Sequence, residues 1–363
     1  MLCQTTDLQA VLQWYLPWHK RRVWFLSAFI LSLLRVMTVN LTRIAHGLNG
    51  HAAPASNDRR IQRFLATFEL DYVLMAQVML HLLPARRRWV ITMDRTIWPF
   101  GRLPINILLV GLVHRGVAFP LFWTVLSKKG NAHTSERIAL MERVLEVVPA
   151  SQIQALVADR EFIGQQWVSW LKKQRIGFAI RLRENALVGP DDQRQRPVRR
   201  LVSHLAVDPV RILRKPRIVY GHRLYLSGLR LATEYLLVVR TQPGRWALDP
   251  YRQRWSIECL FAAFKARGFD FESTHLNRTE RIEKMVALLA LTFAWAFLVG
   301  VWRAQHKPLK MKNHGYKAYS FLRYGADYLQ YILLNIHQQA ATFNQCLRLL
   351  SNPARAFNTH NVV

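Results

Sequence analysis

Apolar residues recur three and four positions apart through the first 85 residues, which is the spacing of helix faces. The segment 8–37 therefore predicts one or two helices, and the segment 41–48 predicts a shorter one. A break that contains Pro54 follows, and a further helix is expected after it with Ser56 as its N-cap. The beginning of the chain is thus predicted to be all-helical.

The helix after this break carries Arg59, Arg60 and Arg63 beside apolar residues at helical spacing. Together with the short helix before it, it is typical of a helix-turn-helix variant with an extended turn. The second helix would enter a major groove, with the arginines at phosphates or guanine edges. A plain helical hairpin with a solvated arginine face is the alternative, and the length of the turn leaves both open.

Beyond Pro84 the helical spacing gives way to short apolar runs, which predict strands. The predicted order is three strands, a helix, a strand, a helix and a strand, at Trp89–Met93, Ile105–Val113, Val117–Leu126, Ser135–Val148, Ile153–Ala158, Phe162–Gln174 and Gly177–Leu182. The second and third strands are joined through His114, Arg115 and Gly116, a spacing that predicts a hairpin. The first of these strands is expected to end at Asp94 and the fourth at Asp159. Alternation of this kind predicts an α/β domain with an aspartate at two strand ends.

A proline-rich stretch from 188 to 250 has strand patterns of its own, which predict a compact β-rich insertion. The strand-like runs are Arg217–Tyr220, Leu224–Leu229 and Tyr235–Val239. Its arginines would line bound DNA or belong to a solvated basic loop, and they include Arg194, Arg196, Arg199, Arg200, Arg211 and Arg214.

The segment Met285–Trp302 has no charged residue and reaches the lower length limit of a transmembrane helix. A helix that is apolar all round can also lie in the core of a large protein, and we favour this alternative. Beyond Trp302 the pattern predicts further helices with many tyrosines.

The chain carries 51 Lys+Arg against 22 Asp+Glu among 363 residues, a formal net charge of +29. Charge of this size favours a polyanionic partner, either nucleic acid or an acidic membrane surface. The three cysteines have no CxxC spacing, and the histidines have no metal-ligand spacing, so neither a disulfide framework nor a zinc site is indicated. A reducing cytosol is the expected compartment.

Tyr251, Arg254, Glu258 and Lys265 form a Y-x2-R-x3-E-x6-K string. On one continuous helix these four side chains would share a broad face. Glu258 would then hold a divalent metal ion, while Arg254 and Lys265 would meet the phosphates of a nucleic acid. Ordinary surface charges on an amphipathic helix are the alternative.

Phosphoryl transfer by two metal ions needs a few fixed carboxylates, and Asp94, Asp159 and Glu258 suit that need. Turn residues are the alternative for a single aspartate at a strand end. Glu161 is a rival carboxylate two residues after Asp159. We prefer Asp159 because the strand is expected to have ended before Glu161.

These residues resemble the DDE transposases of bacterial insertion sequences, in the group called the IS-four family, which has a Y-x2-R-x3-E-x6-K signature. The stretch Met93–Trp98 is similar to the family's D-R-T-x-W block, and Val157–Phe162 is similar to its second aspartate block. The stretch Gly268–His275 after the signature also looks familial. The resemblance covers Trp89–Trp302.

The resemblance implies an RNase H-like catalytic core with a β-rich insertion, preceded by a helical DNA-binding domain. We expect domains at 1–85, at 86–302 with the insertion at about 185–250, and at 303–363, the last being C-terminal helices. It implies two Mg2+ ions, with Mn2+ as an alternative, held by the three carboxylates, and phosphate contacts from Tyr251, Arg254 and Lys265.

The same resemblance implies cut-and-paste transposition of double-stranded DNA at terminal inverted repeats, by a cytoplasmic homodimer in the DNA complex with no membrane association. A metal-dependent nuclease would use the same carboxylates without strand transfer. A catalytically inactive DNA-binding relic would use the basic surface alone. A membrane protein with a basic cytosolic part would leave the ordered acidic blocks unexplained.

Overall fold

The structure is a computed structural model, and it describes residues 2–48, 52–100, 103–207, 210–243, 248–313, 315 and 317–357. The chain forms two compact units. The helical unit comprises residues 1–85, 98–103 and 261–363, and the sheet unit comprises residues 86–97 and 104–260. This division groups the residues differently from the three expected domains, because the helix that spans residue 302 belongs with the first 85 residues.

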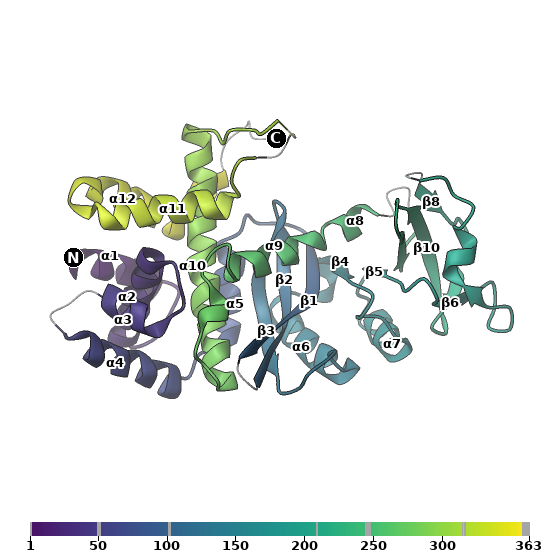
Figure 1. Cartoon of the computed structure of the whole chain (residues 1–363), viewed down its shortest axis with the longest axis horizontal. Coiled ribbons are helices and arrows are strands. Elements are labelled where there is room, and N and C mark those ends of the chain that lie inside the picture. The colour runs from purple at the N-terminus through teal and green to yellow at the C-terminus, as the bar shows by residue number, and fades with distance from the viewer. Residues whose placement is uncertain are drawn as a thin grey trace. The chain divides into compact units, whose positions relative to one another are not determined.

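Nine α-helices are described in the helical unit (Figure 1): α1 Leu2–Gln13, α2 Lys20–Val36, α3 Leu41–Gly47, α4 Pro54–Thr67, α5 Tyr72–His81, α10 Thr279–His306, α11 Phe321–Leu334, α12 Ile336–Ser351 and α13 Ala354–Phe357. The prediction of one or two helices in 8–37 is confirmed, since α1 and α2 cover that segment, and the short helix after them is confirmed as α3. Ser56 is not an N-cap, however. The helix begins at Pro54 after Ala53, because the fixed φ of proline suits the first helical position.

The helix α10 is the centre of the helical unit. It contacts α2, α4, α5, α11, α12 and α13. It is long and apolar enough to cross a membrane, but 94% of its most apolar stretch is buried inside the protein. The apolar segment Met285–Trp302 is therefore explained by core packing.

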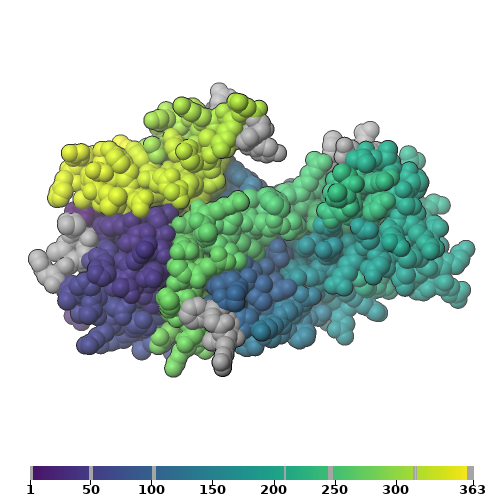
Figure 2. Space-filling model, viewed as in Figure 1, coloured from purple at the N-terminus to yellow at the C-terminus, as the bar shows by residue number. Residues whose placement is uncertain are grey.

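The N-terminal and C-terminal helices meet in this unit, as Figure 2 shows in purple and yellow. The helix α11 contacts α2, and α12 contacts α1. The indole Nε1 of Trp295 on α10 donates to the carbonyl oxygen of Cys346 on α12 at 3.0 Å. Segments from the two ends of the sequence thus share one core.

The sheet unit contains one mixed sheet with the strand order β3-β2-β1-β4-β5-β11-β10-β9-β6-β7, and β8 pairs with β10. The strands are β1 Trp89–Phe100, β2 Leu103–His114, β3 Val117–Leu126, β4 Ile153–Ala158, β5 Phe178–Arg181, β6 Leu187–Gly189, β7 Arg196–Pro197, β8 Val210–Ile212, β9 Arg217–Val219, β10 His222–Arg230 and β11 Tyr235–Arg240. Strand β4 lies parallel to both β1 and β5, whereas β2 is antiparallel to β3 and β11 is antiparallel to β5. The predicted α/β class is confirmed.

The helices of the sheet unit are α6 Thr134–Val147, α7 Gln165–Lys173 and α8 Asp249–Arg252, and α9 Trp255–Phe264 continues from this unit into the helical one. Short 3-10 turns lie at Ala150–Gln152 and Val198–Leu201 here, and at Phe271–Ser273 in the helical unit. The predicted order of three strands, helix, strand, helix and strand is confirmed, and β3 and β4 have the predicted bounds.

The predicted hairpin between β2 and β3 is also confirmed. Arg115 and Gly116 form its turn with φ of 48° and 79°. Positive φ at both central residues matches the right-handed twist of the flanking strands, and glycine adopts it without strain.

Several predicted boundaries are wrong for local reasons. Strand β1 does not end at Asp94 but continues to Phe100, since the β-branched Thr96 and Ile97 favour an extended chain. Ser135 is not the cap of α6. That helix begins after His133, whose backbone N–H donates to Glu136 Oε2 at 2.5 Å, and this contact is half of a capping box.

The insertion is rich in strands as expected, but it is not a separate sheet. Residues Val238–Arg240 of β11 pair with Ala179–Arg181 of β5 in antiparallel register. The sheet of the α/β core therefore continues directly into the insertion.

Candidate active site

Asp94 and Asp159 lie side by side because of the register of two parallel strands. Met93 of β1 pairs with Ala158 of β4, and each aspartate is the next residue along its own chain segment. Strand β4 ends at Ala158, whereas β1 runs on past Asp94. Asp94 is thus fixed within a strand, and Asp159 opens the turn that follows one.

Tyr251 anchors the short helix α8 on the sheet. Its ring is 6% exposed and belongs to a core cluster with Leu248 and sheet residues that include Val90 and Val157. Its hydroxyl donates to Asp159 Oδ1 at 3.5 Å. Burial raises the pKa of Tyr251 to about 12, so the phenol remains a hydrogen-bond donor at neutral pH.

The predicted continuous helix from Tyr251 to Lys265 is wrong. Helix α8 ends at Arg252, a turn contains Gln253 and Arg254, and α9 begins at Trp255. The reason is tertiary: α8 follows the sheet face through Leu248 and Tyr251, and the turn lets the chain leave in a new direction.

Arg254, in this turn, contacts two of the three predicted carboxylates. Its Nη2 lies 2.5 Å from Glu258 Oε1, and its Nη1 lies 3.6 Å from Asp94 Oδ2. Burial works against the charge of Arg254, but the neighbouring groups, Tyr251, Glu258 and Asp159 among them, raise its pKa. With its side chain 13% exposed, this guanidinium is an internal counter-ion for the site.

The carboxyl group of Asp94 has a raised pKa. Burial raises its pKa to about 7, although the backbone N–H of Arg95, which donates to Asp94 Oδ1 at 2.8 Å, and the charge of Arg254 both act to lower it. The charges of Glu161 and Asp159 also raise it. A buried carboxylate beside other carboxylates favours a cation as its partner.

The three carboxylates supply only oxygen donors, which are the donors that Mg2+ and Mn2+ prefer. As the side chains stand, no group of three or more His, Cys, Asp or Glu in the described part of the chain is arranged to hold a metal ion. Arg254 lies among the carboxylates instead. The donor chemistry fits a divalent cation, which would compete with Arg254 for Glu258 and Asp94.

The other predicted site residues have different surroundings. Lys265 follows α9 in the helical unit, where its Nζ lies 3.1 Å from Glu272 Oε1 and 5.2 Å from the centre of the Trp98 ring. Arg59 and Arg63 on α4 are exposed. Arg60 is half-buried against Trp24 and Phe25 and donates to Asn57 Oδ1 at 3.3 Å, so it differs from its two neighbours.

Arg95 is a site residue that was not predicted from the sequence. The Arg95 side chain forms a bidentate ion pair with Glu161, the carboxylate considered as a rival to Asp159. The sequence did contain a clue to this pair, because Arg95 directly follows Asp94 and Glu161 lies two residues after Asp159. Glu161 lies beyond the end of β4, as expected.

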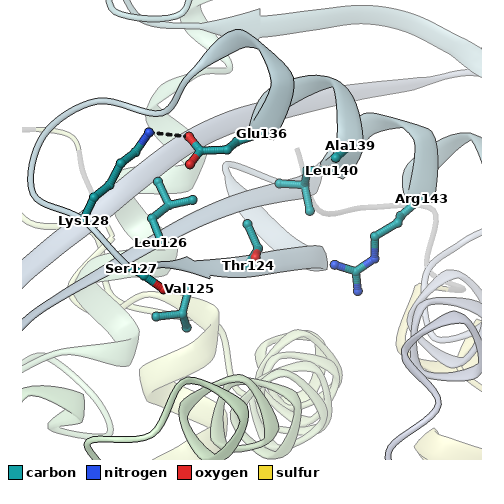
Figure 3. Close-up of a pocket in the computed structure, with 9 residues that line it drawn as sticks. All are labelled: Thr124, Val125, Leu126, Ser127, Lys128, Glu136, Ala139, Leu140 and Arg143. Atoms are coloured by element: carbon teal, nitrogen blue, oxygen red, sulfur yellow. Dashed lines mark ion pairs between the residues drawn. The ribbon is translucent and has the colours of Figure 1, made fainter.

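A pocket of about 540 Å³ lies elsewhere in the sheet unit, between β3 and α6 (Figure 3). Lys128 and Glu136 point toward each other at one end and form an ion pair of 2.7 Å, and Arg143 lies at the other end. Asp94, Asp159 and Glu258 do not line it. The pocket is therefore separate from the carboxylates.

The family model of the transposase DDE domain matches residues 113–295, which is half of the chain. The chain belongs to this family, whose members are transposases that act on DNA. The matched residues include Asp159 and Glu258 and begin after Asp94. No curated protein matches the sequence.

Proposed function

We propose that this protein is a cut-and-paste DNA transposase of the IS-four family, with Asp94, Asp159 and Glu258 as its catalytic carboxylates. The observation that carries the proposal is their convergence. Asp94 on β1 and Glu258 on α9 both form ion pairs with the guanidinium of Arg254, and the charge of Asp159 at the end of β4 also raises the Arg254 pKa. Segments 65 and 99 residues apart in the sequence thus bring their carboxylates to one place, which is typical of a functional site.

We further propose that the core is RNase H-like, as the resemblance implies. The run β3-β2-β1-β4-β5, with β4 parallel to its neighbours on both sides, supports this assignment. So does the placement of the two aspartates on adjacent strands and of the third carboxylate on a helix beyond an insertion.

In this proposal Asp94, Asp159 and Glu258 hold two Mg2+ ions, with Mn2+ as an alternative. Such ions, when bound, lower the pKa of water and stabilise a leaving oxygen. The sheet fixes Asp94 and sets Asp159 beside it, and Tyr251 holds Asp159 through its hydroxyl. Displacement of Arg254 from the carboxylates frees its guanidinium group to bind a phosphate with two hydrogen bonds.

The reaction that these groups serve has two parts. Water attacks the phosphodiester at the end of the element, and the bond to the 3′ oxygen breaks to leave a free 3′-OH. That hydroxyl then attacks a phosphate of the target DNA, the bond from this phosphate to the target 3′ oxygen breaks, and the element is joined to the target with release of a 3′-OH on the target strand. Arg254 and Lys265 bind phosphates near the terminus, and Tyr251 contributes only its hydroxyl because its ring is buried.

DNA recognition is assigned to basic surfaces of both units. Arg59 and Arg63 on α4 are exposed for groove or phosphate contacts, and the half-buried Arg60 supports them. In the insertion, Arg196, Arg199, Arg200 and Arg214 are exposed, whereas Arg194 pairs with Asp191 and Arg211 with His204. Two copies would pair the two terminal inverted repeats as a homodimer in the cytoplasm, associated with the nucleoid when bound.

The test is cleavage of a labelled duplex that carries the terminal repeat found in the DNA flanking this gene, in the presence and absence of Mg2+. We expect Mg2+-dependent cleavage at the repeat boundary, joined products with target DNA, and no cleavage by Glu258→Gln. Cleavage without joining would indicate a simple nuclease. Binding without cleavage under Mg2+ and Mn2+ would indicate a DNA-binding relic and overturn the proposal.

A further inference from the structure

Two residues that neighbour the catalytic aspartates bind each other. Arg95 follows Asp94 on β1, and Glu161 lies two residues after Asp159. Arg95 Nε lies 2.8 Å from Glu161 Oε1, and Arg95 Nη2 lies 3.2 Å from Oε2, so both carboxylate oxygens are engaged. The side chains are 15% and 22% exposed. A paired, two-bond contact with little exposure fixes geometry far better than a surface ion pair does.

The pair is tied to its surroundings by further hydrogen bonds. Arg95 Nη2 donates to Asn131 Oδ1 at 2.9 Å. From α6, the buried Arg137 donates through Nη2 to the carbonyl oxygens of Ala132 at 2.7 Å and Glu161 at 2.9 Å. The contacts thus join β1, the loop before α6 and the turn after β4.

We propose that this Arg95–Glu161 clamp positions Asp94 and Asp159 relative to each other for binding of a divalent metal ion. The inference rests on the proposed function, because it assigns the metal to those aspartates. Its physical basis is the unequal support of the two residues. Asp94 lies within β1, but Asp159 lies where β4 has ended, so pairing between the strands no longer fixes it.

The clamp also explains why Glu161 is a positioning residue rather than a ligand. Both of its oxygens accept from Arg95, and its backbone carbonyl accepts from Arg137. Loss of the Glu161 charge would weaken the two hydrogen bonds that Arg95 donates to it. Loss of Arg95 would release the turn that carries Asp159. Either change removes the same link between the aspartates.

The experiment is a double-mutant cycle on the full-length chain with Glu161→Gln, Arg95→Met and the double variant. Binding of Mn2+ alone is measured by electron paramagnetic resonance, together with the Mn2+ concentration that gives half-maximal cleavage. We expect each single variant to weaken Mn2+ binding about 10-fold, the lower end of the effect of residues that orient metal ligands. The double variant should show about the same 10-fold loss and not about 100-fold, because either change breaks the same contact.

Two further variants complete the design. Asp327→Asn breaks the more exposed Arg323–Asp327 pair on α11, whose atoms lie 2.8 Å apart, and it should leave Mn2+ binding unchanged. Arg95→Lys keeps the positive charge but loses the planar guanidinium group that binds both oxygens of Glu161. It should weaken Mn2+ binding even if Arg95→Met does not fold, so the test does not depend on one variant.

Several outcomes would overturn the clamp. Loss of all Mn2+ binding and cleavage in Glu161→Gln, as complete as in Glu258→Gln, would make Glu161 a ligand. Multiplying effects in the double variant would show independent roles, and a lower melting temperature with unchanged Mn2+ affinity would show a purely structural pair. Failure of the unmutated chain to cleave would overturn the proposed function instead, and the Mn2+ affinities would still decide the clamp.

Discussion

Both units of this protein have apolar cores, but the sheet unit also holds a cluster of charged side chains with little exposure. At the centre of the helical unit, α10 is buried along most of its length by apolar residues, and the buried Lys284 has its Nζ 2.9 Å from the carbonyl oxygen of Leu65. In the sheet unit, Arg137 is buried, and Asp94 and Arg254 are each less than a fifth exposed. Apolar packing accounts for the centre of the helical unit, whereas the sheet unit in addition holds charged groups at a cost in free energy.

This difference separates the sources of stability and function. Apolar burial is favourable by itself, so the sequence of α10 needs no explanation beyond the core. Burial of charged groups is costly even when they are paired. The concentration of such groups around Asp94, Asp159 and Glu258 supports the proposal that these residues form the catalytic site.

The largest effect is expected where α10 and α11 touch. A Cβ added at Gly300 would lie 1.8 Å from the carbonyl oxygen of Phe321, so the two helix backbones would have to separate. We expect Gly300→Ala to destabilise the helical unit by about 3 kcal/mol, measured by urea unfolding. Gly164→Ala is the control, because nothing lies within 4 Å of the added atom. Equal small effects of both changes would contradict the described helix crossing.

The next effect concerns the counter-ion of the site. Arg254→Met should destabilise the metal-free protein by about 2 kcal/mol, because it leaves Glu258 and Asp94 without their cation, and loss of one partner of a buried pair is costly. Addition of Mn2+ should restore part of the melting temperature by supplying another cation. A variant that melts like the unmutated protein with and without Mn2+ would show that Arg254 does not compensate these carboxylates.

A pH effect is expected at His114 of the sheet unit, where Arg86 Nη2 lies 2.8 Å from His114 Nδ1. Burial and the charges of Arg86 and Arg115 lower the pKa of His114 to about 3. In the unfolded chain the imidazole takes up its proton near pH 6.5. Between about pH 3 and pH 6.5 the unfolded state therefore binds more protons than the folded state. The contribution to stability is present above about pH 6.5 and is lost as pH falls toward 3.

Urea unfolding at a series of pH values checks this prediction. His114→Gln should flatten the dependence of the unfolding free energy on pH below 6.5, so the difference from the unmutated protein shrinks in acid. Parallel curves for the two proteins would exclude His114 as the titrating group.

The smallest expected effect is on DNA affinity. Arg59→Ala should weaken binding of every duplex and lower the slope of log K against log salt by about 0.9, the effect of one lost phosphate contact. Arg60→Ala should lower the melting temperature as well, since Arg60 packs over the rings of Trp24 and Phe25. Fluorescence anisotropy between 50 and 200 mM salt gives the slopes, and an unchanged slope for Arg59→Ala would remove α4 from the DNA surface.

Local patterns in the sequence were enough to predict much of the fold. The strand Ile153–Ala158 and the hairpin turn at Arg115 and Gly116 depend on neighbouring residues, and both are confirmed. The end of β1 and the caps of α4 and α6 were not predicted correctly, because the β-branched Thr96 and Ile97, a proline and a capping glutamate decide them.

The site was predictable only in part, because contacts between distant segments of the chain decide its geometry. The apolar runs before Asp94 and Asp159 identified both residues as candidates, whereas the parallel pairing of β1 with β4, which brings them together, is seen only in the structure. The role of Arg254 was not predictable, because it depends on a turn that the packing of α8 imposes on an otherwise helical sequence. The Arg95–Glu161 contact was not predictable either, because the sequence does not tell that the turn after β4 faces Arg95 on β1.

The most direct test of this account is Mn2+ binding to the unmutated chain and to Asp94→Asn, Asp159→Asn and Glu258→Gln, measured by electron paramagnetic resonance. The account predicts that each single change greatly weakens binding while the fold is kept, because the three carboxylates serve one site. Binding that is unchanged by any one of the three substitutions would contradict a shared site and with it the proposed catalytic centre.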